Sequence, residues 1–283
     1  MSGDSLNRRE RSRGIVKLLI VGCGAIGRAV ASALDSSPGM DAMLLFDIVP
    51  GAAGKAAAGL TNATPVDDLS TGLARSDVVL ESASQSAARE LLPKALAAGK
   101  HVVTMSVGAL VDDGFRGECA RLAREHSTRL IIPSGAIGGL DALQSACEAG
   151  LEEVRLTTRK PPAGLEGVEY VVRLGIDLSK LEGPKLLYSG PAREAVRLFP
   201  QNVNVAAAIS IAGLGFDRTT VELVCDPTIE RNTHSLFARG AFGEFEIEMR
   251  NLPSPENPKT SHLAALSAIR AVRRSGASGL ILG

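Results

Sequence analysis

The stretch Lys17–Leu34, KLLIVGCGAIGRAVASAL, decides the fold of this chain. Its apolar start predicts a short strand, its glycines a tight turn, and its alanine-rich end a helix. The glycines fit the pattern G-x-G-x-x-G, in which the first allows the turn, the second lets a pyrophosphate approach the backbone, and the third packs helix on strand. The helix N-terminus would then face the phosphates. The residues that this pattern predicts to bind the cofactor are Gly22, Gly24, Ala25, Ile26 and Gly27.

A second apolar run supports this interpretation. Residues 43–46 end in Asp47, twenty positions after Gly27. An acidic side chain there is placed to accept hydrogen bonds from the adenosine ribose hydroxyls. Its charge repels a 2′-phosphate, which favours NAD over NADP. NADP stays open as an alternative, because Lys55 lies close enough in the sequence to contact a phosphate.

The chain up to Pro133 alternates apolar strands with helical stretches of ordinary length. Further strands are expected at 77–81, 101–105 and 129–132, with helices at 86–98 and 114–126 between them. Such alternation predicts a doubly wound parallel sheet of the Rossmann type. Ligands bind at the carboxyl ends of the strands in sheets of this kind.

The pattern changes after Pro133. Residues 244–250 alternate apolar side chains with three glutamates, as in a half-exposed antiparallel strand, and 154–158 and 220–226 are similar. We interpret the glutamate face as solvated. These features predict an α/β fold whose second α+β domain has a mostly antiparallel sheet. The predicted domains are a disordered tail over 1–14, a dinucleotide-binding domain over 15–133 completed by 256–283, and a substrate and dimerisation domain over 134–255.

Composition excludes several classes of function. The 283 residues carry 31 basic and 31 acidic side chains, so no net charge attracts nucleic acid or an anionic membrane. No apolar run is long enough for a signal peptide or a membrane span, which predicts a cytoplasmic protein. The four cysteines are scattered without metal-binding spacing, so we expect reduced thiols and no metal site.

His234 is the strongest candidate for proton transfer. The other three histidines fall at the ends of predicted strands or helices, where ordinary structural roles are available. His234 follows the polar stretch 226–233, which predicts a loop between two strands. Loops held by a rigid sheet often carry function, and histidine titrates near neutral pH.

Several motifs together resemble one family, the L-aspartate dehydrogenases. They span nearly the whole chain after the tail, and no departure from the family pattern stands out in them. The motifs are Gly22–Gly27, Pro133–Leu143 (PSGAIGGLDAL), Phe199–Ala206 (FPQNVNVA), Asp226-Pro227 with Asn232-Thr233-His234, and Asn257–Ser261 (NPKTS).

The resemblance implies an NAD(P)-dependent enzyme that deaminates L-aspartate to iminosuccinate, or oxaloacetate and ammonia, or runs the reverse amination. Such a product can feed pyridine nucleotide biosynthesis. The resemblance further implies that His234 is the active-site acid and base. It implies that Ala136 and an asparagine contact the nicotinamide end of the cofactor, with Asn204 the first choice and Asn202 the second. An alternative for both asparagines is capping of the following helix.

Aspartate carries two carboxylates, so its site needs cationic donors. The candidates are Lys259, Arg231, Lys160 and Arg159, with Lys259 favoured because it lies in a family motif. The resemblance and the expected exposed sheet both indicate a homodimer. Two other functions stay open: a related Rossmann dehydrogenase or reductase acting on homoserine or a dihydrodipicolinate-like substrate, and a non-catalytic NAD-binding sensor or scaffold.

Overall fold

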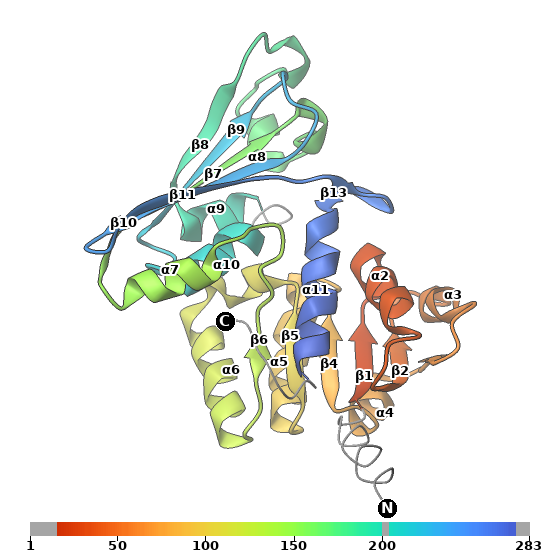
Figure 1. Cartoon of the computed structure of the whole chain (residues 1–283). Helices are drawn as coiled ribbons and strands as arrows, with labels where there is room; N and C mark the ends of the chain where they lie inside the picture. The colour runs from red at the N-terminus through yellow and green to blue at the C-terminus, as the bar shows by residue number, and fades with distance from the viewer. Residues whose placement is uncertain (1–15, 200–203, 276–283) are drawn as a thin grey trace, which may run out of the picture. The chain divides into compact units, whose positions relative to one another are not determined.

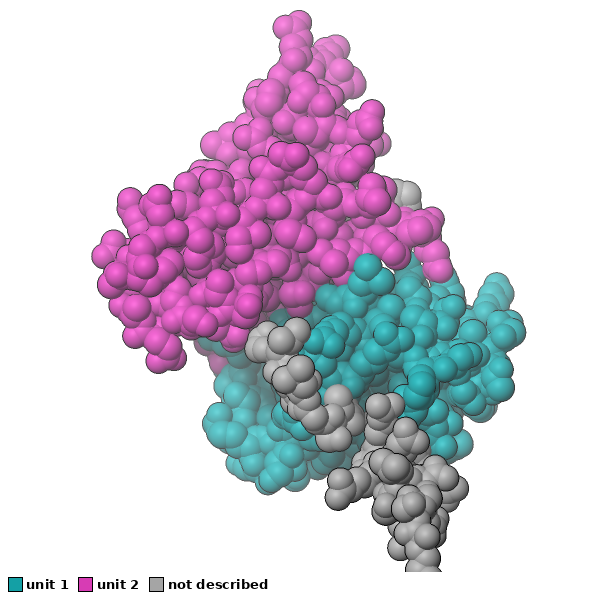
Figure 2. All heavy atoms as spheres, viewed as in Figure 1, with its two compact units in different colours: residues 1–106, 114–133, 265–283 teal, residues 107–113, 134–264 magenta. Residues whose placement is uncertain are grey.

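The structure, a computed structural model, describes residues 16–199 and 204–275. The chain divides into two compact units, coloured separately in Figure 2. Unit 1 contains residues 1–106, 114–133 and 265–283, and unit 2 contains 107–113 and 134–264. The domain boundaries expected from the sequence stay a prediction, and the predicted tail over 1–14 lies outside the described residues.

Unit 1 is built on a parallel sheet of six strands (Figure 1). Its order β3-β2-β1-β4-β5-β6 is that of a doubly wound dinucleotide-binding fold, which confirms the predicted fold class. The central strands are fully buried, with Leu19, Leu80 and Val103 inaccessible to solvent. The strands are β1 (Val16–Val21), β2 (Met40–Phe46), β3 (Ala63–Pro65), β4 (Val78–Glu81), β5 (His101–Thr104) and β6 (Leu130–Ile131).

The helices of unit 1 connect these strands in the expected alternation. The alanine-rich stretch after Asp47 forms a shorter helix than the sequence pattern suggests, because Ala58 leaves the helical conformation ahead of Gly59. The helices are α2 (Ala25–Leu34), α3 (Ala52–Ala57), α4 (Leu69–Ala74), α5 (Gln85–Ala97), α6 (Asp113–Glu125) and α11 (His262–Ser275), the last assigned to unit 1 from residue 265.

Unit 2 contains a five-stranded sheet in the order β11-β10-β7-β9-β8. Three of its four strand pairs are antiparallel, whereas β7 and β9 run parallel, so the sheet is mixed but mostly antiparallel, as predicted. The strands are β7 (Leu151–Lys160), β8 (Lys185–Pro191), β9 (Thr219–Cys225), β10 (Thr233–Gly240) and β11 (Gly243–Arg250). A two-stranded ribbon, β12 (Pro253–Ser254) with β13 (Asn257–Ser261), follows.

The two faces of this sheet differ in polarity. One face buries Val154, Leu156, Val221 and Leu236, and helices of the same unit contact β8 and β9. The other face carries the glutamates at 244, 246 and 248, which are exposed as predicted. The unit's helical segments are η1 (Val107–Val111), α7 (Leu140–Cys147), η2 (Pro162–Gly164), α8 (Glu169–Arg173), η3 (Leu178–Lys180), α9 (Ala192–Leu198) and α10 (Asn204–Ala212). Among the described residues, no helix is both long and apolar enough to cross a membrane.

Candidate active site

The glycine turn between β1 and α2 is held by close backbone contacts. The backbone N–H of Gly22 donates to the carbonyl of Phe46 at 2.9 Å, which joins the turn to β2. A Cβ atom on Gly27 would lie 2.1 Å from the carbonyl oxygen of Gly22, and Gly22 itself has φ +95°. Only glycine fits at both positions, as the motif requires. The helix can therefore begin directly behind the strand.

Gly24 presents the face on which a ligand would lie. A Cβ atom built on Gly24 meets no described atom within 4 Å, and Gly24 is exposed. No side chain of the described residues caps α2, whose N-cap is Gly24, so its first N–H groups keep their hydrogen-bonding capacity. An uncapped helix N-terminus beside an open glycine fits the pyrophosphate of a dinucleotide.

Asp47 stands at the carboxyl end of β2, where the sequence places it. One of its carboxylate oxygens accepts from the N–H of Cys23 at 2.7 Å, and the other from the N–H of Val49 at 2.8 Å. These bonds orient the carboxylate and tie it to the glycine turn. Because each carboxylate oxygen offers two lone pairs, the group can still accept from ribose hydroxyls.

Glu81, at the carboxyl end of β4, is a residue that the sequence argument did not single out. Its carboxylate is completely buried and accepts four hydrogen bonds within unit 1. The donors are the N–H of Ala83, the hydroxyl of Thr104, and both the N–H and the hydroxyl of Ser106. Glu81 thus fixes the loops that follow β4 and β5 at the ligand-binding edge of the sheet. An acid ending an apolar strand was the available signal.

His234 lies within strand β10, so the predicted loop position is wrong. The polar residues before it hide the strand's start, yet from Thr233 on alternate side chains are buried. In register, His234 pairs with Thr158 on β7 and Met249 on β11. Its Nδ1 lies 3.0 Å from the hydroxyl of Thr158. Because Thr158 contacts Nδ1, Nε2 is the ring nitrogen left for proton exchange.

The surroundings of His234 favour the neutral imidazole. Burial, together with the positive charge of Lys160, lowers the pKa of His234 from 6.5 to about 3. Lys160 lies two positions beyond Thr158 on β7, hence on the same face, and burial lowers the pKa of Lys160 from 10.5 to about 8. A neutral base and a buried cation therefore share one face of the sheet.

The remaining basic candidates are placed differently. Arg159 points to the opposite face of β7 and pairs with Asp226 at 3.4 Å. Arg231 is exposed, ahead of β10. The backbone of Lys259 lies in β13, but its side chain is outside the described residues. Of the four cationic candidates, Lys160 is the one whose charge acts on His234.

The residues expected at the nicotinamide end are also in unit 2. Ala136 is buried, and its carbonyl accepts from Nδ2 of Asn251 at 2.8 Å. Asn204 begins α10 and accepts through Oδ1 from the N–H of Gly108 at 3.1 Å, which fixes its amide plane. Asn202 lies outside the described residues. No set of three or more His, Cys, Asp and Glu side chains suited to a metal occurs within 16–199 and 204–275.

Family models match both parts of the chain. Residues 141–275 match the model described as aspartate dehydrogenase, C-terminal, and residues 22–133 match the model described as homoserine dehydrogenase, NAD binding domain. The second match agrees with the dinucleotide-binding geometry of the glycine turn.

Relatives match over nearly the whole length. The L-aspartate dehydrogenase of Methanosarcina acetivorans is 48% identical over 265 residues, covering 92% of this chain and 97% of that protein. The one from Bradyrhizobium diazoefficiens is 37% identical, covering 93% and 92%. The crystal structure of aspartate dehydrogenase from Thermotoga maritima superposes with a TM-score of 0.76 at 28% identity, covering 95% and 99%. A homoserine dehydrogenase from Thiobacillus denitrificans, at 14% identity and TM-score 0.59, shares the fold over 92% of this chain and 73% of that one.

The first prediction concerns the open position at Gly24. Gly24→Ala adds a methyl group where no described atom lies, so the folded protein should keep its thermal stability. The methyl group would obstruct a pyrophosphate, and NADH binding should weaken by about tenfold, since a hydrogen bond to a charged group contributes about 1.5–3 kcal/mol. NADH fluorescence titration measures this. Gly117→Ala is the control, because that exposed position in α6 is equally open. Equal affinity in both variants would contradict the assignment.

The second prediction concerns the buried imidazole. Between pH 6.5 and pH 3 the unfolded chain protonates residue 234 while the folded chain does not, so stability falls as pH falls through that window. Wild type should lose about 1.4 kcal/mol more per pH unit than His234→Gln below pH 6. Urea unfolding at pH 6.5, 5.5 and 4.5 measures the difference. Parallel curves for the two proteins would show that the imidazole ionises freely in the folded state.

Proposed function

Because this chain belongs to the L-aspartate dehydrogenase family, we propose that it deaminates L-aspartate oxidatively with NAD(P), or runs the reverse amination. The product, iminosuccinate, hydrolyses to oxaloacetate and ammonia and can supply pyridine nucleotide biosynthesis. The observation that carries this proposal is 48% identity to an L-aspartate dehydrogenase over 92% of the chain, which includes both units. The chemistry at His234 supports it.

In this proposal, unit 1 holds the cofactor. Gly22, Gly24, and Gly27 shape the turn, and the N–H groups at Ala25 and Ile26 bind the pyrophosphate. Asp47 accepts from the adenosine ribose, and its charge favours NAD over NADP. Bound NAD accepts a hydride from Cα of the substrate. Ala136 and Asn204 contact the nicotinamide end, with Asn202 the alternative to Asn204.

His234 performs the proton transfers. The oxidation converts L-aspartate and NAD⁺ to iminosuccinate, NADH and a proton. Neutral His234 takes a proton through Nε2 and then activates the water that attacks the imine carbon, releasing ammonia and oxaloacetate. A substrate with two carboxylates offsets the charge of Lys160 and thereby raises the pKa of His234 above its value in the free protein.

Lys160 is the cation that we assign to a substrate carboxylate. Its ammonium group is buried, and a bound carboxylate would restore the charge compensation that burial removes. Lys259 stays a second proposal from the family motif, and the exposed Arg231 a third.

The alternatives receive less support. Likeness to homoserine dehydrogenase is confined to the model of the NAD-binding part and to a fold shared at 14% identity. A sensor or scaffold without catalysis has no need of a buried imidazole whose orientation is set by Thr158.

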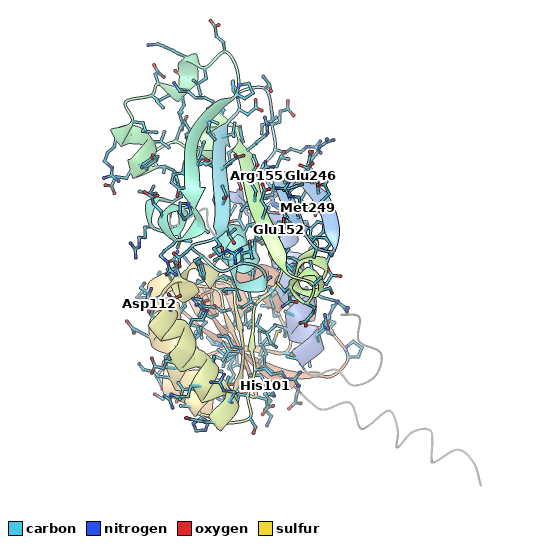
Figure 3. The ribbon with its side chains drawn as sticks, turned by 90° about the vertical axis from the view of Figure 1, so that its left-hand side faces the viewer. His101, Asp112, Glu152, Arg155, Glu246 and Met249 are labelled. Carbon is cyan, nitrogen blue, oxygen red and sulfur yellow. The ribbon has the colours of Figure 1, made fainter. Side chains whose placement is uncertain are left out.

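We further propose that the protein is a cytoplasmic homodimer. All four cysteines are free thiols, which suits a reducing compartment. The outer face of the sheet in unit 2 places Arg155, Phe237 and Glu246 in one row across three strands. Figure 3 labels two of them, Arg155 and Glu246. The guanidinium of Arg155 stacks on Phe237 at 5.2 Å, which gives this half-exposed face an apolar centre within a charged surround.

The third prediction tests the reaction and its acid–base group. Wild-type protein should reduce NAD in the presence of L-aspartate, and more slowly or not at all with homoserine or glutamate, as followed by absorbance of NADH. His234→Ala should lower kcat by about 10²–10⁴, the contribution of general acid–base catalysis, while NADH affinity changes little. Gly117→Ala serves again as the control. Near-normal turnover in His234→Ala would remove the assigned role.

The fourth prediction concerns assembly. Sedimentation at micromolar concentration should give twice the chain mass of 29.4 kDa. Phe237→Glu places a charge at the centre of the proposed contact and should shift the protein toward monomer, because an unpaired charge buried in an interface is costly. Glu244→Gln, on the same face but at the end of β11, should not. A monomeric wild type would disprove the dimer.

A further inference from the structure

One face of β11 carries the glycine-rich segment 134–139. Ile247, Met249 and Asn251 occupy every second position, so they point to the same side of the strand. A Cβ atom on Gly139 would lie 2.1 Å from Cδ1 of Ile247, and one on Gly138 would lie 3.6 Å from Sδ of Met249. Glycine-rich segment and strand are therefore in close contact, and Figure 3 labels Met249 within the sheet.

Asn251 completes this row with a hydrogen bond. Its Nδ2 donates to the carbonyl oxygen of Ala136 at 2.8 Å, across 115 positions of sequence. Asn251 is 6% exposed and Ala136 7%, so water cannot readily replace this bond. The bond therefore determines where the Ala136 peptide lies.

The same asparagine is attached to the strand of His234. Its backbone N–H donates to the carbonyl of Asn232 at 3.0 Å, one pair beyond the ladder that joins β10 and β11. Within that ladder, Met249 pairs directly with His234. Asn251 thus joins Ala136 through its side chain and the residues just before His234 through its backbone.

We propose that Asn251 is a positioning residue for the dehydrogenase reaction: it sets the place of the Ala136 backbone relative to His234. The inference rests on the proposed function, in which Ala136 contacts the nicotinamide end of the cofactor and His234 moves the proton. Asn251 acts through the Ala136 peptide and its hydrogen bond. Hydride transfer and proton transfer both act on the carbon and nitrogen of one C–N bond, so their donors and acceptors require a fixed spacing.

The test replaces the amide with a hydrocarbon of similar shape. Asn251→Leu removes the donor to Ala136, and Asn62→Leu is the matched control, since Nδ2 of Asn62 also donates to a backbone carbonyl, that of Asp35 in unit 1. Thermal unfolding verifies that each variant folds. Asn251→Ser, small and polar, is the second variant if Asn251→Leu does not fold.

Two measurements separate positioning from general destabilisation. The kcat with L-aspartate should fall by about tenfold to a hundredfold in the Asn251 variants, as expected for a displacement of about 1 Å. Their NADH affinity should weaken by about threefold to tenfold, while the affinity for ADP-ribose, which lacks the nicotinamide, stays at the wild-type value. Asn62→Leu should change neither kcat nor the ratio of the two affinities.

Two results would overturn the inference. One is a folded Asn251 variant with wild-type kcat and wild-type affinity ratio. The other is equal weakening of NADH and ADP-ribose binding, which indicates a general loss of structure. Failure of the proposed function is separate, because it shows as absence of L-aspartate-dependent NADH formation in wild-type protein. In that case the ratio of NADH to ADP-ribose affinity still tests whether Asn251 positions the Ala136 peptide.

Discussion

The constraint on which unit 1 depends is the contact between Gly27 and the carbonyl oxygen of Gly22, where no Cβ atom fits. It lets α2 start directly behind β1 and points its first N–H groups away from the sheet. Asp47 reinforces the corner, since its carboxylate holds the N–H of Cys23 at 2.7 Å. The same groups that stabilise the turn are thus those that would bind the dinucleotide. Glu81 extends this arrangement to the loops after β4 and β5 through four hydrogen bonds.

Unit 2 depends on a different constraint, the burial of polar groups on one face of a sheet. His234, Thr158 and Lys160 are each at most 6% exposed, and the lowered pKa of His234 is the consequence. Burying an imidazole as its cation next to an ammonium group would be costly, so the free protein keeps it neutral. A dianionic substrate changes that electrostatic balance. The buried pair therefore links substrate charge to the proton affinity of the base.

Much of the fold followed from periodicity. The β1–turn–α2 stretch, the alternation of strands and helices in unit 1, and the two-residue period of 244–250 each report local packing, and each matches the structure. The location of His234 was less accessible. The polar run before it resembles a loop, and only pairing with β7 and β11 makes it a strand. Thr158 and Asn251 gave no signal, because their roles depend on partners 76 and 115 positions away.

The sequence by itself determined the dinucleotide-binding corner, the class of each unit and the family, because these depend on residues close together in the chain or on motifs in a fixed order. The tertiary structure alone decided which basic side chain acts on the imidazole, which ring nitrogen is held, and what fixes the Ala136 peptide. Strand register brings those groups together, and register is set by the packing of the whole sheet rather than by any single stretch. Burial likewise belongs to the folded unit, and burial is what changes the proton affinities of His234 and Lys160.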